Sequence, residues 1–212
     1  MKIAIVGATG KFGSRIAAEA AARGHAVVAI SRRPAARQLG SDITPFAADV
    51  TDTQALARAF AGCDAVVHAY RPDITSDTRY EQQKTGTGSV LAALKLAGVP
   101  RILAVGGAGS LIHEGVVFKH HPAFPKDWAT GAVVTYLVKE MLESEPGLRW
   151  TFLCPPNMVA PGARTGVFRL GLDDMIVAAD GTSTISLEDY AVAMVDELEV
   201  PRHDNRRFTV GY

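Results

Sequence analysis

Short apolar runs alternate with longer amphipathic segments along the first three quarters of the chain. The runs are rich in Val, Ile and Ala, which favours buried strands, and the segments between them carry apolar residues at helical spacing. We therefore expect strands at 3–6, 26–30, 44–47, 65–69, 102–105 and 150–153, and helices at 11–23, 53–61, 78–97 and 129–144. Strands and helices in alternation indicate βαβ units around a parallel sheet, with helices on both faces.

The last quarter of the chain breaks this rhythm. Pro and Gly residues interrupt the sequence between 155 and 162, and a shorter, less regular tail follows. Within the tail we expect an amphipathic helix over 187–199 and a closing strand at 208–210. Nothing marks a boundary between two domains, so we expect a single domain over 1–212, in which 155–212 contributes the smaller, substrate-side portion.

Several helix ends carry recognisable signals. Thr51 begins a capping-box pattern ahead of the second helix, and Ser186 stands three positions before Asp189 at the start of the tail helix. Gly24 and Gly98 follow two other helices, at the position where a left-handed residue closes a helix. We expect all of these residues to act structurally.

Composition and charge narrow the class of protein. The 22 Lys and Arg residues balance 22 Asp and Glu, and they are scattered, so no basic patch favours nucleic acid or an anionic membrane. No stretch approaches the roughly 18 apolar residues of a membrane span, and the N-terminus lacks the pattern of a signal peptide. Cys63 and Cys154 lie far apart, which disfavours a disulfide or a zinc site. These features predict a soluble cytoplasmic protein.

The most informative motif directly follows the first predicted strand and opens the first predicted helix. Gly7 permits a tight turn, Gly10 lets the backbone approach a pyrophosphate, and Gly13 allows the helix to pack closely on the strand. The helix N-terminus adds unpaired N–H groups that attract an anion. The whole motif is expected to bind a dinucleotide through Gly7, Thr9, Gly10, Lys11, Phe12 and Gly13. This places the chain in the α/β class, as a doubly wound Rossmann fold with a small C-terminal appendage.

The end of the second strand bears on the choice of dinucleotide. A cofactor with a free 2′-hydroxyl is usually held by an acidic residue at this position, whereas a 2′-phosphate is held by Arg. The chain has Ser31, Arg32 and Arg33 here and no carboxylate. We therefore predict NADP(H) rather than NAD(H), with Arg32 as the main phosphate ligand. The alternative is a solvated basic turn.

Other strand ends should complete the cofactor site, because ligands of doubly wound sheets bind at the carboxyl ends of the strands. Asp49 and Val50 follow the third strand and either reach the adenine or form a turn. Small residues after the fifth strand leave room for a ribose and a flat acceptor. Further contacts are expected from His68, Ala69 and Tyr70, from Gly106 and Gly107, and from Pro155, Pro156 and Asn157.

Taken together, the motifs at 7–13, 49–50, 105–110, 153–158 and 185–190 resemble those of atypical short-chain dehydrogenases/reductases. The last three are most similar to the NADH-flavin reductase group, which is related to biliverdin reductase B and to the NmrA-like redox sensors. The resemblance implies an NAD(P)H-dependent reductase. It further implies flavin or quinone reduction, in which the acceptor itself supplies much of the chemistry.

The same resemblance suggests catalytic residues, but the match is incomplete. In the superfamily a Tyr and a Lys four positions later share a helix face, and a Ser holds the substrate. Here Tyr136 and Lys139 stand three positions apart, and Ser110 precedes Tyr136 after the fifth strand. These three residues are the catalytic candidates. The alternative is that Tyr136 packs and Lys139 is solvated.

Three functions therefore remain open. The first is NADPH-dependent reduction of a flavin- or quinone-like acceptor by a monomer or homodimer. The second is an atypical dehydrogenase or epimerase acting on a small carbonyl or sugar substrate, and the third is a nonenzymatic NADP(H)-sensing regulator. The segment 113–128 contains three aromatic residues and is expected to cover the acceptor. Its adjacent pair His120 and His121 has no Cys or carboxylate at ligand spacing, so we expect no metal.

Overall fold

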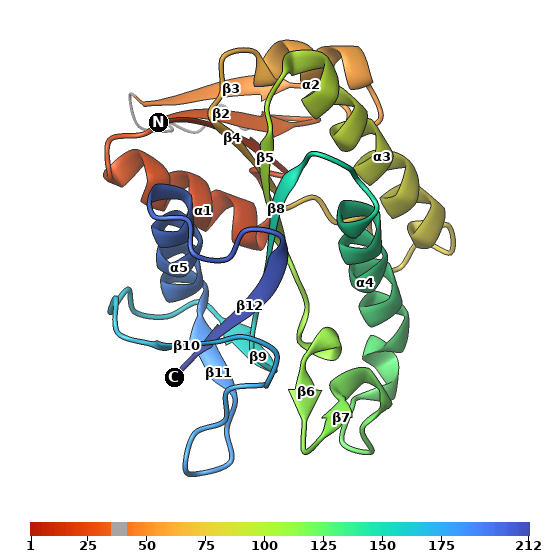
Figure 1. The fold of residues 1–212 in the computed structure, drawn as a ribbon, viewed down its shortest axis with the longest axis vertical. Coiled ribbons are helices and arrows are strands. Elements are labelled where there is room, and N and C mark those ends of the chain that lie inside the picture. Colours follow the sequence, from red (N-terminus) through yellow and green to blue (C-terminus); the bar gives the residue numbers. More distant parts are fainter. Residues whose placement is uncertain (35–41) are drawn as a thin grey trace.

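The computed structural model, which describes residues 1–34 and 42–212, is built on an eight-stranded sheet in the order β10-β12-β8-β5-β4-β1-β2-β3 (Figure 1). Seven strands are parallel, and β10 at the edge is antiparallel to β12. The strands are β1 (Lys2–Val6), β2 (Ala26–Ser31), β3 (Ile43–Ala47), β4 (Ala65–His68), β5 (Arg101–Val105), β8 (Arg149–Cys154), β10 (Arg169–Gly171) and β12 (Arg206–Gly211). The predicted α/β fold is confirmed.

Helices cover both faces of this sheet (Figure 1). One face carries α1 (Lys11–Ala22) packed against α5 (Leu187–Glu199), and the other carries α2 (Thr53–Phe60), α3 (Arg79–Ala97) and α4 (Ala129–Glu143). Successive residues of a strand point to opposite faces. In β1, Ala4 and Val6 join the core under α2 to α4, whereas Ile3 and Ile5 join the core under α1 and α5. Burial on both faces explains why the strand sequences are continuously apolar.

The short elements outside the sheet were not predicted. β6 (Ile112–His113) and β7 (Val116–Val117) form a hairpin, whose two-residue turn places Glu114 and Gly115 at φ 50° and 78°. β9 (Met158–Ala160) pairs in parallel with β11 (Thr184–Ser186) beside the main sheet. Three single 3₁₀ turns lie at Ala108–Ser110, Phe118–His120 and Lys126–Trp128. Runs of two or three residues give no measurable periodicity, which is why the sequence did not reveal them.

The predicted helix ends are confirmed except at α2. Gly24 and Gly98 take φ values of 80° and 68°, and Ser186 Oγ accepts a hydrogen bond from the Asp189 N–H at 2.9 Å. The cap of α2 is Asp52, whose carboxylate accepts from the Ala55 N–H at 2.9 Å. The expected cap at Thr51 is wrong because the Thr51 hydroxyl donates to Asp49 instead, at 2.7 Å.

Two features of this fold bear on function. The strand order reverses between β1 and β4, and a crevice forms at the carboxyl ends of strands that meet at such a switch point. Among the residues that the structure describes, no helix is both long enough and apolar enough to cross a membrane.

Candidate functional site

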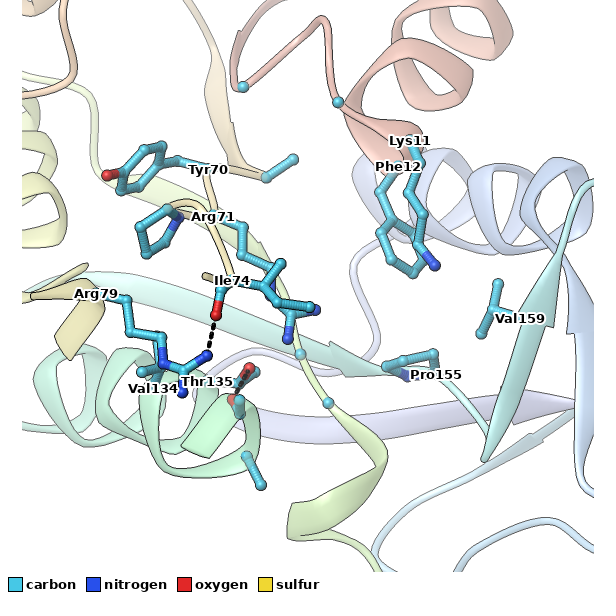
Figure 2. A pocket seen from close by; sticks show the side chains of 18 of the residues that line it. Lys11, Phe12, Tyr70, Arg71, Ile74, Arg79, Val134, Thr135, Pro155 and Val159 are labelled. Carbon is cyan, nitrogen blue, oxygen red and sulfur yellow. Dashed lines mark hydrogen bonds between the residues drawn. The ribbon is translucent and has the colours of Figure 1, made fainter. Parts of the chain in front are cut away.

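A cleft of about 730 Å³ opens at the carboxyl ends of the central strands (Figure 2). Its wall is formed by the segments that follow β1, β2, β3, β4, β5 and β8, together with the first turns of α4. Most of the predicted cofactor residues line it: Gly7, Thr9, Gly10, Lys11, Phe12, Ser31, Arg32, Val50, Ala69, Tyr70, Gly106, Gly107, Pro155, Pro156 and Asn157.

The glycine loop is shaped by two close backbone approaches. Gly7 has φ 86°, and a Cβ at this position would lie 2.6 Å from the carbonyl oxygen of Ala69 at the end of β4. A Cβ on Gly13 would lie 2.3 Å from the Gly7 carbonyl oxygen. Gly13 is therefore absent from the cleft wall and acts by letting α1 pack against the turn. No side chain caps the N-terminus of α1 at Gly10, so its first N–H groups are free to meet an anion.

Arg33, Asp49 and His68, three other predicted contacts, do not line the cleft. Asp49 is engaged in a turn, where its Oδ1 accepts from the Thr51 N–H at 2.9 Å and from the Thr51 hydroxyl at 2.7 Å. These hydrogen bonds lower the pKa of the Asp49 carboxyl. Of the two roles considered for Asp49, the structure shows the turn.

His68 lies behind the cleft wall rather than on it. As the last residue of β4 it points towards α3, where its Nε2 lies 3.1 Å from the Thr87 hydroxyl. The side chain is only 2% exposed, and burial lowers its pKa to about 4. The ring stacks against Tyr70, with centroids 6.3 Å apart, and Tyr70 faces the cleft. His68 therefore supports a wall residue from beneath.

A glycine inside α3 makes room for the same part of the wall. A Cβ on Gly86 would lie 2.9 Å from Cε1 of Tyr70 and 3.0 Å from Cγ1 of Val50. Glycine in a helix interior costs about 1 kcal/mol relative to Ala. Here that cost is offset by the close packing of Tyr70 and Val50.

The tail holds the far end of the cleft in place. The N–H of Asn157 lies 3.3 Å from the Ser183 hydroxyl, and the Met158 N–H donates to the Ser183 carbonyl at 2.9 Å. Asp189 at the start of α5 accepts from the N–H groups of Thr165 and Gly166, both at 2.8 Å. These contacts position the segment after β8, and a substrate-side role for 155–212 stays a prediction.

Cationic side chains dominate the cleft. Lys11, Arg32, Arg71 and Arg79 line it, whereas Asp127 is the single carboxylate on the described part of its wall. Desolvation and the nearby Arg71 lower the pKa of Lys11. This excess of positive charge favours a ligand that carries several negative charges. Sequence reasoning missed Arg71, although its place two residues beyond the predicted end of a strand was a usable signal.

Two buried oxygens without hydrogen-bond partners lie at opposite ends of the cleft. Ser31 Oγ is at the end of β2, and Asn157 Oδ1 follows β8. Four strand steps of about 4.8 Å separate β2 from β8, which gives roughly 19 Å. This length suits an extended dinucleotide, and Ser31, Arg32, Lys11 and Asn157 line the cleft with polar or charged groups. The residues present therefore fit a nicotinamide dinucleotide.

The three expected catalytic residues meet elsewhere. Ser110, Tyr136 and Lys139 line a separate cavity of about 330 Å³, together with Arg206 and Arg207. Lys139 Nζ pairs with Glu143 at 2.5 Å, and Lys119 Nζ lies 4.0 Å from the centre of the Tyr136 ring. Positions 131, 132 and 135 of α4 line the cleft, whereas positions 136, 139 and 143 line this second cavity. The spacing makes Tyr136 and Lys139 neighbours, but the structure places them with Ser110 in the second cavity rather than in the cofactor cleft. A catalytic role for these three residues stays a prediction.

The aromatic segment 113–128 borders the cleft. Phe124 and Trp128 line it, and the buried Phe118 packs edge-on against Phe124 with ring centroids 5.2 Å apart. A cover formed by this segment stays a prediction.

The turn of this segment also brings together side chains that the sequence did not connect. The potential ligand atoms of His113, Glu114 and His121 lie within 4.8 Å of one another, so a carboxylate does come close to histidine here. Both ring nitrogens of His121 are engaged in hydrogen bonds: Nε2 lies 3.2 Å from Glu114, and Nδ1 accepts from the Ala123 N–H at 3.2 Å. These hydrogen bonds account for the cluster.

Comparison with known proteins supports the assignment of this cleft to a nicotinamide dinucleotide. A sequence profile described as NAD(P)H-binding matches residues 7–201. The chain is 39% identical over 214 residues to the uncharacterised protein YwnB of Bacillus subtilis, covering 99% of this chain and 98% of that protein.

Two solved structures are similar over the whole chain. A proposed epimerase from Bacteroides thetaiotaomicron is 38% identical with a TM-score of 0.90, covering 100% of this chain and 96% of its own. A proposed NADH-flavin reductase from Streptococcus pneumoniae is 31% identical with a TM-score of 0.87, covering 100% and 99%. The residues that line the cleft, the matching profile and these relatives all lead to one conclusion: the chain belongs to the NAD(P)H-binding family.

Proposed function

We propose that the protein is an NADPH-dependent oxidoreductase that transfers a hydride to a flavin- or quinone-like acceptor. The observation that carries the proposal is the composition of the cleft beyond the glycine loop. Gly106, Gly107 and Gly109 line this part of the cleft without side chains, and the aromatic side chains of Phe124 and Trp128 line it beside them. An aromatic wall of this kind suits a planar ring.

In the described part of the chain, no tyrosine that could act as an acid lines this end of the cleft, which supports an electron-poor ring as the acceptor. Tyr136 lines the second cavity. Tyr70 is the one tyrosine on the described wall, where it packs with Val50 against Gly86; burial raises its pKa, and Arg32 and Asp49 are close enough to affect it. An unactivated ketone needs a general acid worth about 10²–10⁴ in rate, whereas a flavin or quinone needs mainly correct placement against the hydride donor.

The bound dihydronicotinamide would supply the hydride, that is, two electrons with one hydrogen, and solvent would supply the proton that completes acceptor reduction. The residues of this chain bind and orient. Pro155 and Pro156 stiffen the backbone beside Asn157, the glycine loop holds the phosphates, and the aromatic segment excludes water.

The choice of NADPH rests on Arg32 and Ser31. Arg32 is exposed and lines the cleft, and the unpaired Ser31 hydroxyl lies beside it in the chain. An arginine fork and a hydroxyl can together bind a 2′-phosphate. Cys63 and Cys154 are both free and buried, which fits the reducing cytoplasm where we propose that the protein works.

The test is NADPH consumption by the purified protein with FMN, FAD or a small quinone, run beside NADH. Acceptor-dependent consumption with NADPH preferred would support the proposal. Tight NADPH binding without turnover on any of these acceptors would contradict it and favour a sensor. Turnover on a sugar or small carbonyl compound alone would favour a dehydrogenase or epimerase, as the similarity to a proposed epimerase allows.

A further inference from the structure

One arginine, Arg71, extends into the cleft, whose described wall carries a single carboxylate, Asp127. Figure 2 shows Arg71 extending from the loop after β4 into the middle of the pocket, with Lys11 and Phe12 of α1 across from it. Its guanidinium reaches the first turns of α4, since a Cβ on Gly131 would lie 2.8 Å from Arg71 Nη2. Glycine at 131 therefore leaves the space that this guanidinium occupies.

The surroundings of Arg71 are cationic. None of the hydrogen bonds or ion pairs found in residues 1–34 and 42–212 involves its side chain. Burial and the nearby Arg79 lower the pKa of Arg71, and Arg71 in turn lowers the pKa of Lys11. Arg79 also lines the cleft, where its guanidinium donates to the Ile74 carbonyl oxygen. Two neighbouring guanidiniums with no carboxylate between them disfavour each other, and an anionic group bound there would remove this cost.

Arg71 comes from a different segment than the groups expected to bind the cofactor phosphates, although it is close enough to Lys11 to lower the pKa of that side chain. Arg32 stands at the end of β2, and Lys11 belongs to the glycine loop after β1. Arg71 reaches instead to α4, whose neighbouring residues Ala132 and Thr135 contact the glycines at 107 and 109. That is the part of the cleft to which the acceptor is assigned under the proposed function.

We infer that the acceptor carries an anionic group, a phosphate or a carboxylate, and that Arg71 binds this group with Arg79 beside it. This inference rests on the proposed function. It narrows the acceptor class from any flavin or quinone to those with a charged side chain, and it makes Arg71 a residue that determines specificity.

Flavins that share one ring system and differ in charge provide the test. FMN and riboflavin differ by a phosphate, and 10-carboxymethylflavin and lumiflavin differ by a carboxylate. Equilibrium binding of each oxidised flavin to the NADP⁺-loaded protein is measured by quenching of flavin fluorescence. We expect the anionic member of at least one pair to bind about tenfold more tightly at low salt, and the preference to fall as ionic strength rises.

The variant Arg71→Gln should reduce the preference to within about twofold while leaving riboflavin binding unchanged, because only the charged contact is lost. Arg202→Gln removes the same charge from an exposed loop outside the cleft and should keep the preference. Gly131→Ala should weaken it, since the added methyl group displaces the guanidinium.

Equal binding of charged and neutral flavins by the unmodified protein would overturn the inference. So would an Arg71→Gln variant that loses affinity for NADP⁺ but retains its flavin preference, since Arg71 would then serve the cofactor. If the preference depends on Arg71 but no flavin is reduced, the inference on binding holds and the proposed function fails. If both flavins of each pair are reduced equally well by Arg71→Gln and by the unmodified protein, the proposed function stands and the inference fails.

Discussion

The two cavities beside α4 both contain residues that were predicted from the sequence to be functional. The grounds for the prediction differ between the cleft and the second cavity. The cleft contains the glycine loop, which is defined by backbone sterics: a Cβ at 13 would lie 2.3 Å from a carbonyl oxygen. The second cavity contains Ser110, Tyr136 and Lys139, which were marked by similarity to a catalytic pattern whose spacing this chain does not keep. In the second cavity Lys139 is already paired with Glu143.

The comparison shows when the role of a family motif can be carried over to this chain: when local backbone geometry explains why each residue of the motif is needed. Gly7, Gly10 and Gly13 have such reasons within one turn of chain, so the structure places them as expected. Tyr136 and Lys139 needed a particular rotation of α4 relative to the sheet. The apolar stripe Val134, Leu137, Val138 and Leu142 sets that rotation, and it turns the pair away from the cleft.

The largest effect should come from the glycine loop. Gly13→Ala places a methyl group against backbone that cannot move aside. We expect the free energy of unfolding to fall by roughly 3 kcal/mol and NADPH binding to be lost. Denaturant unfolding and cofactor titration measure both. Gly88→Ala is the matched control: a Cβ there meets nothing closer than Met141 Cε at 3.8 Å, so α3 should gain up to about 1 kcal/mol. Equal stability of the two variants would contradict the conclusion that backbone sterics require glycine at position 13.

The buried histidine behind the cleft should produce a pH dependence of nearly the same size. Burial lowers the pKa of His68 to about 4, whereas an unfolded histidine titrates near 6.5. The unfolded chain therefore takes up a proton first, so stability is full above about pH 6.5 and falls by about 3 kcal/mol as the pH drops towards 4. His68→Gln should reduce this loss of stability at acid pH. The control His120→Gln, which changes a histidine on an exposed turn, should leave the loss unchanged. If His68→Gln is too unstable to measure, NMR titration of His68 in the unaltered protein decides: a normal pKa would contradict the prediction.

Arg32 should have an intermediate effect, limited to one cofactor. Arg32→Gln removes a guanidinium from the proposed 2′-phosphate site, and we expect the Kd for NADPH to rise about tenfold or more, with the Kd for NADH unchanged within twofold. Isothermal titration with both cofactors measures the ratio. An unchanged ratio would assign Arg32 to a solvated turn.

The smallest effect should come from the second cavity. Tyr136→Phe should leave NADPH-dependent flavin reduction within about twofold, because Tyr136 lines the other cavity and not the cleft. A fall in kcat of about 10²-fold or more would contradict the conclusion that Tyr136 lies outside the reacting part of the protein, since loss of a general acid has effects of that order.

The sequence predicted the seven parallel strands of the sheet and the five long helices to within one or two residues at each end, because strand and helix periodicity are local, but it did not predict the antiparallel edge strand β10. It also predicted most of the cleft wall, since ligands of doubly wound sheets bind at strand ends. Arg71 was missed because its importance comes from reaching α4, about sixty positions away in the chain. The short strands β9 and β11 were missed because they exist through pairing with each other.

The two unpaired oxygens, Ser31 Oγ and Asn157 Oδ1, mark two halves of the cleft that a designed ligand could bind separately. A phosphorylated nucleoside fragment would address the half near β2, and a small aromatic amide would address the half near β8. Neither fragment needs the other, so each can be optimised separately. Joining them with a linker of matched length would then convert two weak ligands into one strong ligand, through the high effective concentration of the second fragment.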